Sequence, residues 1–188
     1  MAEGESSSGQ PKTTSGSGEA SAGVSTGDAK SPAAKAAAAR AKAAAKAKEG
    51  PPKKPLADNG DGTITDPNSG LMWKKSDAWI DTQRFYTWQD HKEYIDKINK
   101  EKFAGYDDWR LPSKAEAMTI FDKSKECLDK NGTPFFIDPI FEAGGASNTW
   151  ISECSDEKII RFDFKVGVDT SYPTQDIWGS MRLVRKPD

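Results

Sequence analysis

The aromatic residues of this 188-residue chain are confined to one part of it. All six Trp, four Tyr and eight Phe lie at or after Trp73, and residues 1–55 contain none. A segment without large apolar side chains cannot bury enough surface to offset an ordering entropy of about 1–2 kcal/mol per residue. We therefore expect a disordered tail over residues 1–55 and one folded domain over residues 56–188, a length that suits a single core.

Charge divides at the same place. Residues 1–55 carry a net charge of +4 and residues 56–188 a net charge of −6. The chain therefore combines a basic tail with an acidic domain, although its total net charge is only −2. Within the tail, the Ala-rich composition and Pro32 predict a transient helix over residues 32–49. This helix would carry five cations: Lys35, Arg40, Lys42, Lys46 and Lys48. Two interpretations stay open for them, a weak, salt-dependent contact with nucleic acid or another anionic surface, and a solvated spacer.

Neither a membrane span nor a secretory signal is predicted. The chain has no run of about 18 apolar residues, the length a transmembrane helix needs. Its start, Met1-Ala2-Glu3-Gly4-Glu5, is acidic and lacks an apolar segment behind it. Taken as written, this sequence favours a cytoplasmic location.

Turn and cap residues place the first elements of the domain. Residues 58–75 are typical of a β-hairpin, with strands at 63–65 and 71–73 and a Pro- and Gly-containing turn between them. A helix is predicted from Thr87 to Asn99, because residues 88, 91, 94, 95 and 98 form one apolar face. A second helix should begin at Ser113, which makes a capping box with Glu116. The side chains expected to be buried on that second helix are those of Ala115, Met118, Thr119 and Phe121.

The C-terminal half indicates strands. Residues 127–148 are loop-like, and strands are predicted at 149–154, 159–166 and 181–185. Two early helices followed by antiparallel strands favour an α+β domain.

Four separated segments carry a family resemblance: residues 58–73, 103–113 (Phe-Ala-Gly-Tyr-Asp-Asp-Trp-Arg-Leu-Pro-Ser), 148–152 and 179–185. In this order and spacing they resemble a bacterial family of domains of unknown function that includes the C-terminal domain of the collagen-like adhesin Lcl. The resemblance implies a C-type-lectin-like fold whose N- and C-terminal strands pair, with Trp109 as a buried anchor. It also implies a cell-surface or secreted role, since the adhesin relatives act in adhesion and bind sulfated glycans.

No catalytic, metal or cofactor site is predicted. Ser-His-Asp chemistry needs a histidine, and the single one, His91, falls on the apolar face of the first helix. Asp58, Asp61 and Asp66 are better explained as turn residues than as Ca²⁺ ligands, because glycines occupy two of the ligand slots. Residues 110–113 also resemble a segment of formylglycine-generating enzymes. Those enzymes depend on a cysteine pair near the C-terminus, and no cysteine follows Cys154.

The two cysteines leave two interpretations open. Cys127 and Cys154 either close a disulfide or remain free thiols, and the lack of a signal peptide favours free thiols.

A loop between two predicted strands, residues 167–178, is the candidate binding segment. It offers four side chains suited to hydrogen-bonding a sugar or a polar protein surface: Asp169, Tyr172, Gln175 and Asp176. The favoured hypothesis is a non-enzymatic recognition or adhesion module that binds a protein or a polysaccharide. The alternatives are a nucleic-acid- or anionic-surface-associated protein that acts through its tail, and a degenerate enzyme scaffold.

Overall fold

The computed structural model describes residues 53–173 and 176–187. The chain divides into two compact units between Pro51 and Pro52, and every described residue belongs to the second unit. The predicted tail helix and the five tail cations lie outside the described residues.

The N-terminal hairpin forms as its turn residues predict. Strands β2 (Thr63–Asp66) and β3 (Leu71–Lys74) pair antiparallel, and the short β1 (Ala57–Asp58) extends the sheet beyond β2. The carboxylate of Asp66 closes the turn by accepting hydrogen bonds from the Asn68 backbone and the Ser69 hydroxyl.

The last strand of the chain completes this sheet. Strand β9 (Val184–Arg185) pairs antiparallel with β3, with Trp73 opposite Val184. The sheet order is β1-β2-β3-β9, which joins the two ends of the domain. The expected pairing of N- and C-terminal strands is confirmed.

The described residues contain three α-helices where two were expected. Helix α3 (His91–Lys100) begins four residues later than predicted, because residues 88–90 form a turn instead. Helix α4 (Lys114–Ile120) begins at its predicted capping box. The additional helix, α2 (Ala78–Thr82), is only five residues long and is capped by the carboxylate of Asp77. A 3₁₀ turn, η1 (Phe103–Gly105), follows α3.

The buried face predicted for α4 was wrong in part: Ala115 and Met118 are exposed, although Phe121 packs half-buried against the core. Ala117 and Ile120 are buried, whereas Met118 is 41% exposed. The helix makes only about two turns. Over so short a length, the pattern of apolar residues fits two neighbouring faces of the helix equally well. Packing against the distant hairpin and β7 determines that the face with Ala117 and Ile120 is the buried one.

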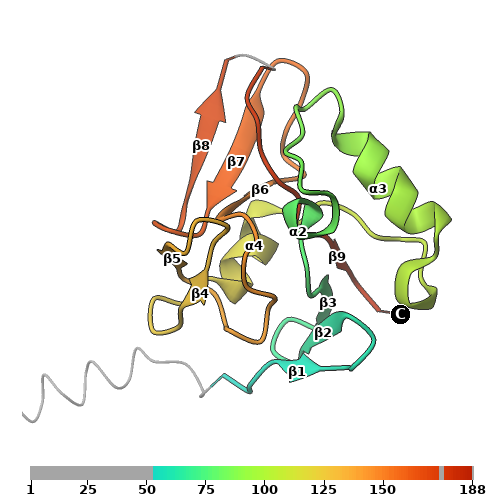
Figure 1. Cartoon of the computed structure of the whole chain (residues 1–188), viewed down its shortest axis with the longest axis vertical. Helices are drawn as coiled ribbons and strands as arrows, with labels where there is room; N and C mark the ends of the chain where they lie inside the picture. Colours follow the sequence, from blue (N-terminus) through green and yellow to red (C-terminus); the bar gives the residue numbers. More distant parts are fainter. Residues whose placement is uncertain (1–52, 174–175, 188) are drawn as a thin grey trace, which may run out of the picture. The chain divides into compact units, whose positions relative to one another are not determined.

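The C-terminal half contains two further small sheets. Strands β4 (Cys127–Leu128) and β5 (Pro134–Phe135) pair within the segment expected to be a loop. Strands β6 (Asn148–Trp150), β7 (Ile159–Asp163) and β8 (Val168–Tyr172) form an antiparallel sheet in that order. Figure 1 shows this sheet at the end of the domain opposite β1 and β2.

Two hydrophobic clusters hold the layers together. One packs the hairpin and α4 against β7 around Trp73 and Phe162. The other packs α3 against β6 and the C-terminal segment around Trp109 and Trp150. The domain is therefore an α+β fold, as the sequence predicts. Cys127 and Cys154 are free thiols in this arrangement.

Candidate recognition surface

The structure places two of the four predicted binding residues, Asp169 and Tyr172, on opposite faces of a strand. Residues 167–178 were expected to form one loop, but β8 occupies 168–172 and its side chains alternate between the two faces of the sheet. Asp169 lies on one face, where Lys114 of α4 pairs with it at 2.6 Å. Tyr172 lies on the other face. Gln175 is outside the described residues, and Asp176 is exposed.

Arg161 on β7 is a functional candidate that the sequence analysis missed. Its guanidinium donates hydrogen bonds to the Tyr172 hydroxyl and to the Trp178 carbonyl, both at 2.8 Å, and lies 5.1 Å from the centre of the Tyr172 ring. The sequence does indicate that Arg161 faces outward, because it lies between the apolar residues Ile160 and Phe162. Alternation along a strand then places its side chain on the opposite face of β7. Arg161 fixes both Tyr172 and the segment after β8.

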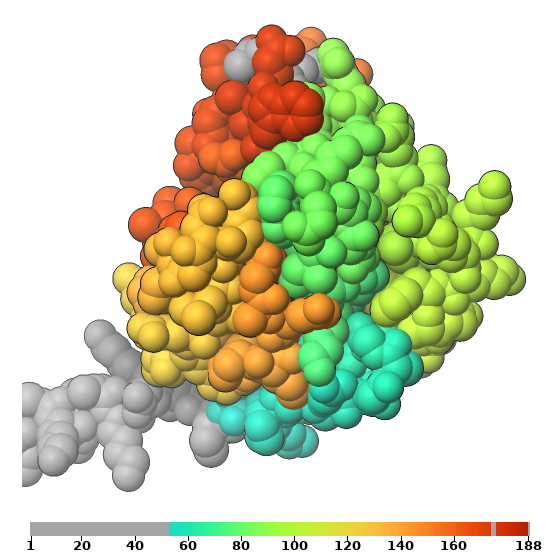
Figure 2. Space-filling view, in the orientation of Figure 1, coloured from blue at the N-terminus to red at the C-terminus, as the bar shows by residue number. Residues whose placement is uncertain are grey.

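Two tryptophans extend this surface. Trp178 is 56% exposed, an unusual state for so large an apolar side chain. Trp88 lies in the turn before α3, contacts the buried Trp150 edge-on at 6.4 Å, and donates from its indole nitrogen to Asp156 at 3.3 Å. We define the recognition surface as Trp88, Arg161, Tyr172 and Trp178. Figure 2 shows the red segment after β8 beside the green segment before α3 at one end of the molecule.

His91 supports this surface from beneath, as a boundary histidine. Its ring stacks on Trp88 with centroids 3.8 Å apart, and its Nδ1 contacts the Trp88 carbonyl. Burial lowers the pKa of His91 below its ordinary value of 6.5, although the Trp88 carbonyl acts in the opposite direction. His91 is therefore neutral in the folded domain at neutral pH.

Stability should consequently fall as the pH is lowered from about 6.5. The unfolded chain takes up a proton on His91 in this range while the folded chain does not, which costs at most about 1.4 kcal/mol per pH unit. Urea unfolding at pH 7.5 and 5.5 measures the effect. The variant His91→Phe, which retains an aromatic ring against Trp88, should lose most of this pH dependence. If the free energy of unfolding of that variant changed with pH as much as that of the wild type, the effect would belong to titratable groups other than His91.

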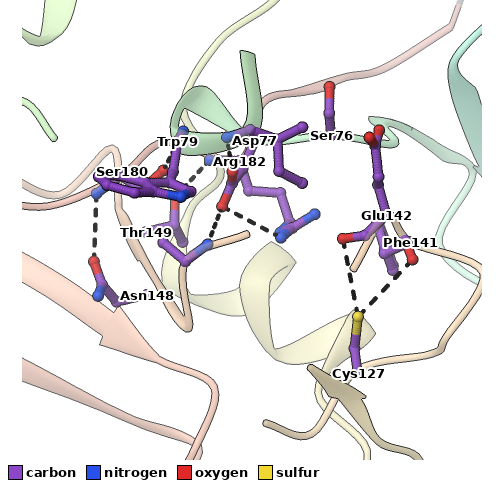
Figure 3. A network of polar contacts seen from close by, with 12 residues as sticks. Ser76, Asp77, Trp79, Cys127, Phe141, Glu142, Asn148, Thr149, Ser180 and Arg182 are labelled. Carbon is purple, nitrogen blue, oxygen red and sulfur yellow. Dashed lines mark hydrogen bonds and ion pairs between the residues drawn. The ribbon is translucent and has the colours of Figure 1, made fainter. Parts of the chain in front are cut away.

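Asp77 and Arg182 form a buried ion pair within a network of polar contacts (Figure 3). The side chains of Asp77 and Arg182 are each 1% exposed, and Arg182 Nη2 lies 3.6 Å from Asp77 Oδ2. Asp77 also accepts hydrogen bonds from the backbone of Ile80 and of Ala146, at 3.0 and 2.6 Å. The guanidinium lies over the Phe141 ring. These contacts connect α2 to the loop before β6, so the pair is structural.

A second polar cluster lines a cavity of about 360 Å³ beside α3. Lys74 pairs with Asp81 at 2.6 Å and contacts the Ser76 hydroxyl, while Tyr94 donates to Asp81 at 2.7 Å. Burial acts to raise the pKa of Asp81, but its hydrogen bonds, foremost the one from Lys74, lower it below the ordinary range. The Ser76 hydroxyl donates a hydrogen bond to this carboxylate at 2.7 Å, and the lowered pKa makes the carboxylate a weak base. The arrangement therefore does not activate Ser76 as a nucleophile.

The remaining sequence candidates have structural roles. Asp58, Asp61 and Asp66 each accept a hydrogen bond from a backbone N–H two residues ahead, which is typical of turn residues. Arg110 forms a two-pronged ion pair with Glu116, and Asp108 pairs with Arg185. Among residues 53–173 and 176–187, no group of three or more metal-ligating side chains is found.

Within the same described ranges, no helix is both long and apolar enough to span a bilayer. A family model described as the Lcl C-terminal domain matches residues 62–185. No curated protein and no solved structure matches the chain, so the C-type-lectin-like fold stays a prediction. Since the match extends over well above half of its length, the chain belongs to the Lcl C-terminal domain family.

Proposed function

We propose that this domain is a non-enzymatic recognition module that binds a protein or a polysaccharide through the recognition surface. The observation that carries the proposal is Trp178, a tryptophan 56% exposed to solvent whose backbone is held in place by Arg161. Tryptophan and tyrosine offer large contact areas at a small cost in side-chain entropy, and they dominate the energetics of many interfaces.

Rigidity is the second supporting argument. Arg161 binds the Tyr172 hydroxyl and the backbone carbonyl of Trp178, and the Trp88 side chain packs on buried Trp150. Side chains that are already ordered lose little freedom when a ligand binds, so more of the contact energy appears as affinity. Aromatic side chains beside fixed polar groups suit the apolar face of a sugar ring or a polar protein surface.

The net charge of the domain and the contacts of Arg161 indicate which class of ligand fits the recognition surface. The folded region carries a net charge of −6 over residues 56–188. The cation of the recognition surface, Arg161, is already engaged by Tyr172 and Trp178. A neutral polysaccharide or a protein therefore fits this surface better than a polyanion does.

Replacing Trp178 with alanine should weaken ligand binding at least about tenfold and change stability by less than about 0.5 kcal/mol, because its side chain is largely exposed. Binding of the full chain to a glycan array and to an immobilised protein panel provides the measurement. Val166→Ala is the matched control, since Val166 is equally exposed, at 55%, near the other end of the β7–β8 hairpin. Undiminished binding by the Trp178 variant to every ligand of the wild type would refute the proposal.

A further inference from the structure

Strand β8 has one paired edge and one open edge. In the sheet order β6-β7-β8, it pairs with β7 over five residues and with no other strand among the described residues. Figure 1 shows its other edge on the outside of the domain. An open edge presents a row of backbone donors and acceptors that another strand can use.

The pairing of β7 shows which groups of β8 are free. The Ile160 carbonyl and the Phe164 amide both form hydrogen bonds on the β6 side of β7. The residues that alternate with them, Arg161 among them, therefore bond to β8, and they do so through its partners Val168, Thr170 and Tyr172. By the same alternation, Asp169 and Ser171 direct their N–H and C=O groups outward.

Strand β8 lacks most of the features that commonly protect an open edge. Such edges are blunted by lysine, proline, a bulge, a very short strand or an inward-pointing charge, and of these β8 has only the last, Asp169 opposite the buried Phe162. The sequence Val-Asp-Thr-Ser-Tyr of residues 168–172 contains neither lysine nor proline, and its register with β7 is continuous. Its one charged side chain, Asp169, is paired with Lys114. Val168, at the start of the strand, is 51% exposed.

We propose that β8 pairs antiparallel with β8 of a second copy of this chain, about a two-fold axis at Thr170. The strand is complementary to itself in this register. Asp169 faces Ser171 of the second copy, so that both N–H···O=C bonds of each such pair form between the outward groups. Val168 faces Tyr172 of the second copy, an aliphatic–aromatic pair of the kind that stabilises sheets, and no like charges meet.

This association goes beyond the proposed function and does not depend on it. A contact between two five-residue strands is smaller than the interface of a stable dimer, so the dissociation constant should be on the order of 100 µM. Because the two strands run antiparallel, Tyr172 ends the strand at opposite sides of the dimer, and each side therefore carries one recognition surface. A ligand with repeated epitopes would then be held by two surfaces at once, which raises its overall affinity.

Sedimentation velocity of the full chain, at increasing concentration, tests the association. We expect a reversible monomer–dimer equilibrium. Ser171→Pro removes an outward N–H that β7 does not use, and should weaken dimerisation at least about tenfold. Ser171→Ala keeps that N–H and should dimerise as the wild type does. Thermal melts of both variants verify the fold.

A charge-swap experiment tests the register independently. Thr170→Lys and Thr170→Glu should each abolish self-association, because like charges then meet at the two-fold axis. An equimolar mixture of the two variants should associate again. A wild type that stays monomeric to near-millimolar concentration, a closed trimer, or undiminished association of the Ser171→Pro variant would each overturn the proposal.

Discussion

Replacing Trp109 with alanine should lower the free energy of unfolding by about 3–5 kcal/mol, the range for truncating a buried large side chain. Trp109 is 1% exposed, and its indole N–H donates to the Phe103 carbonyl at 3.1 Å. Its backbone exchanges two hydrogen bonds with the side chain of Asn99 on α3. The substitution would leave a cavity between α3 and η1. It would also remove one of the two hydrogen bonds that the Phe103 carbonyl accepts, while the bond from the Tyr106 N–H would remain. Urea unfolding followed by far-UV circular dichroism gives the value.

Trp109→Phe separates packing from hydrogen bonding in the same site. It retains most of the ring volume but loses the indole N–H, so it should cost clearly less than the alanine variant. Trp178→Ala is the exposed control and should change stability by less than about 0.5 kcal/mol. Equal stability of the Trp109→Ala variant and the wild type would show that Trp109 does not anchor the domain.

Removing Asp77 should cost about 3–5 kcal/mol, because the Arg182 guanidinium would then be buried without a counter-ion. Asp77→Ala also removes the cap of α2 and the acceptor for the Ala146 N–H. The reverse deletion also leaves a buried charge without its counter-ion, but it should be milder, because the Asp77 carboxylate keeps the hydrogen bonds from the Ile80 and Ala146 backbone. Arg182 Nε and Nη2 form no hydrogen bond, since the 3.6 Å ion-pair contact is too long for one. Methionine at position 182 would remove these unsatisfied donors and still pack on Phe141.

We therefore expect Arg182→Met to be more stable than Asp77→Ala by at least about 2 kcal/mol. Chemical unfolding of the two single variants and of the double variant Asp77→Ala/Arg182→Met measures this difference and the coupling between the residues. The double variant should be no less stable than Asp77→Ala alone. Equal losses in the two single variants would mean that Arg182 contributes as much as Asp77.

Local chemistry made part of this fold predictable. The β2–β3 hairpin follows from turn residues within a few positions of one another, and the start of α4 follows from the Ser113–Glu116 capping box. The class, α+β, follows from the order of these patterns. In each case the residues that determine the structure are neighbours in the sequence.

The errors concern features that distant contacts determine. Helix α2 is too short for a periodic pattern, and its cap, Asp77, is positioned by partners about 70 and 105 residues away, Ala146 and Arg182. The side chains of β8 are mostly exposed, so apolar alternation does not mark it as a strand. Arg161 belongs to the candidate site only because β8 folds back beside β7 and brings Tyr172 within reach.

The arrangement of the two ends of the domain determines how it would bear force. Near the start of the described residues, Lys54 lies beside the turn between β2 and β3. The Asn68 side chain in this turn binds both the N–H and the carbonyl of Lys54, at 2.8 and 2.9 Å. The recognition surface lies at the opposite end (Figure 1). A ligand pulling on that surface while the N-terminal end is held would load the domain along its length. The Asn68 contacts with Lys54 would be the first to carry the tension, before the core is loaded.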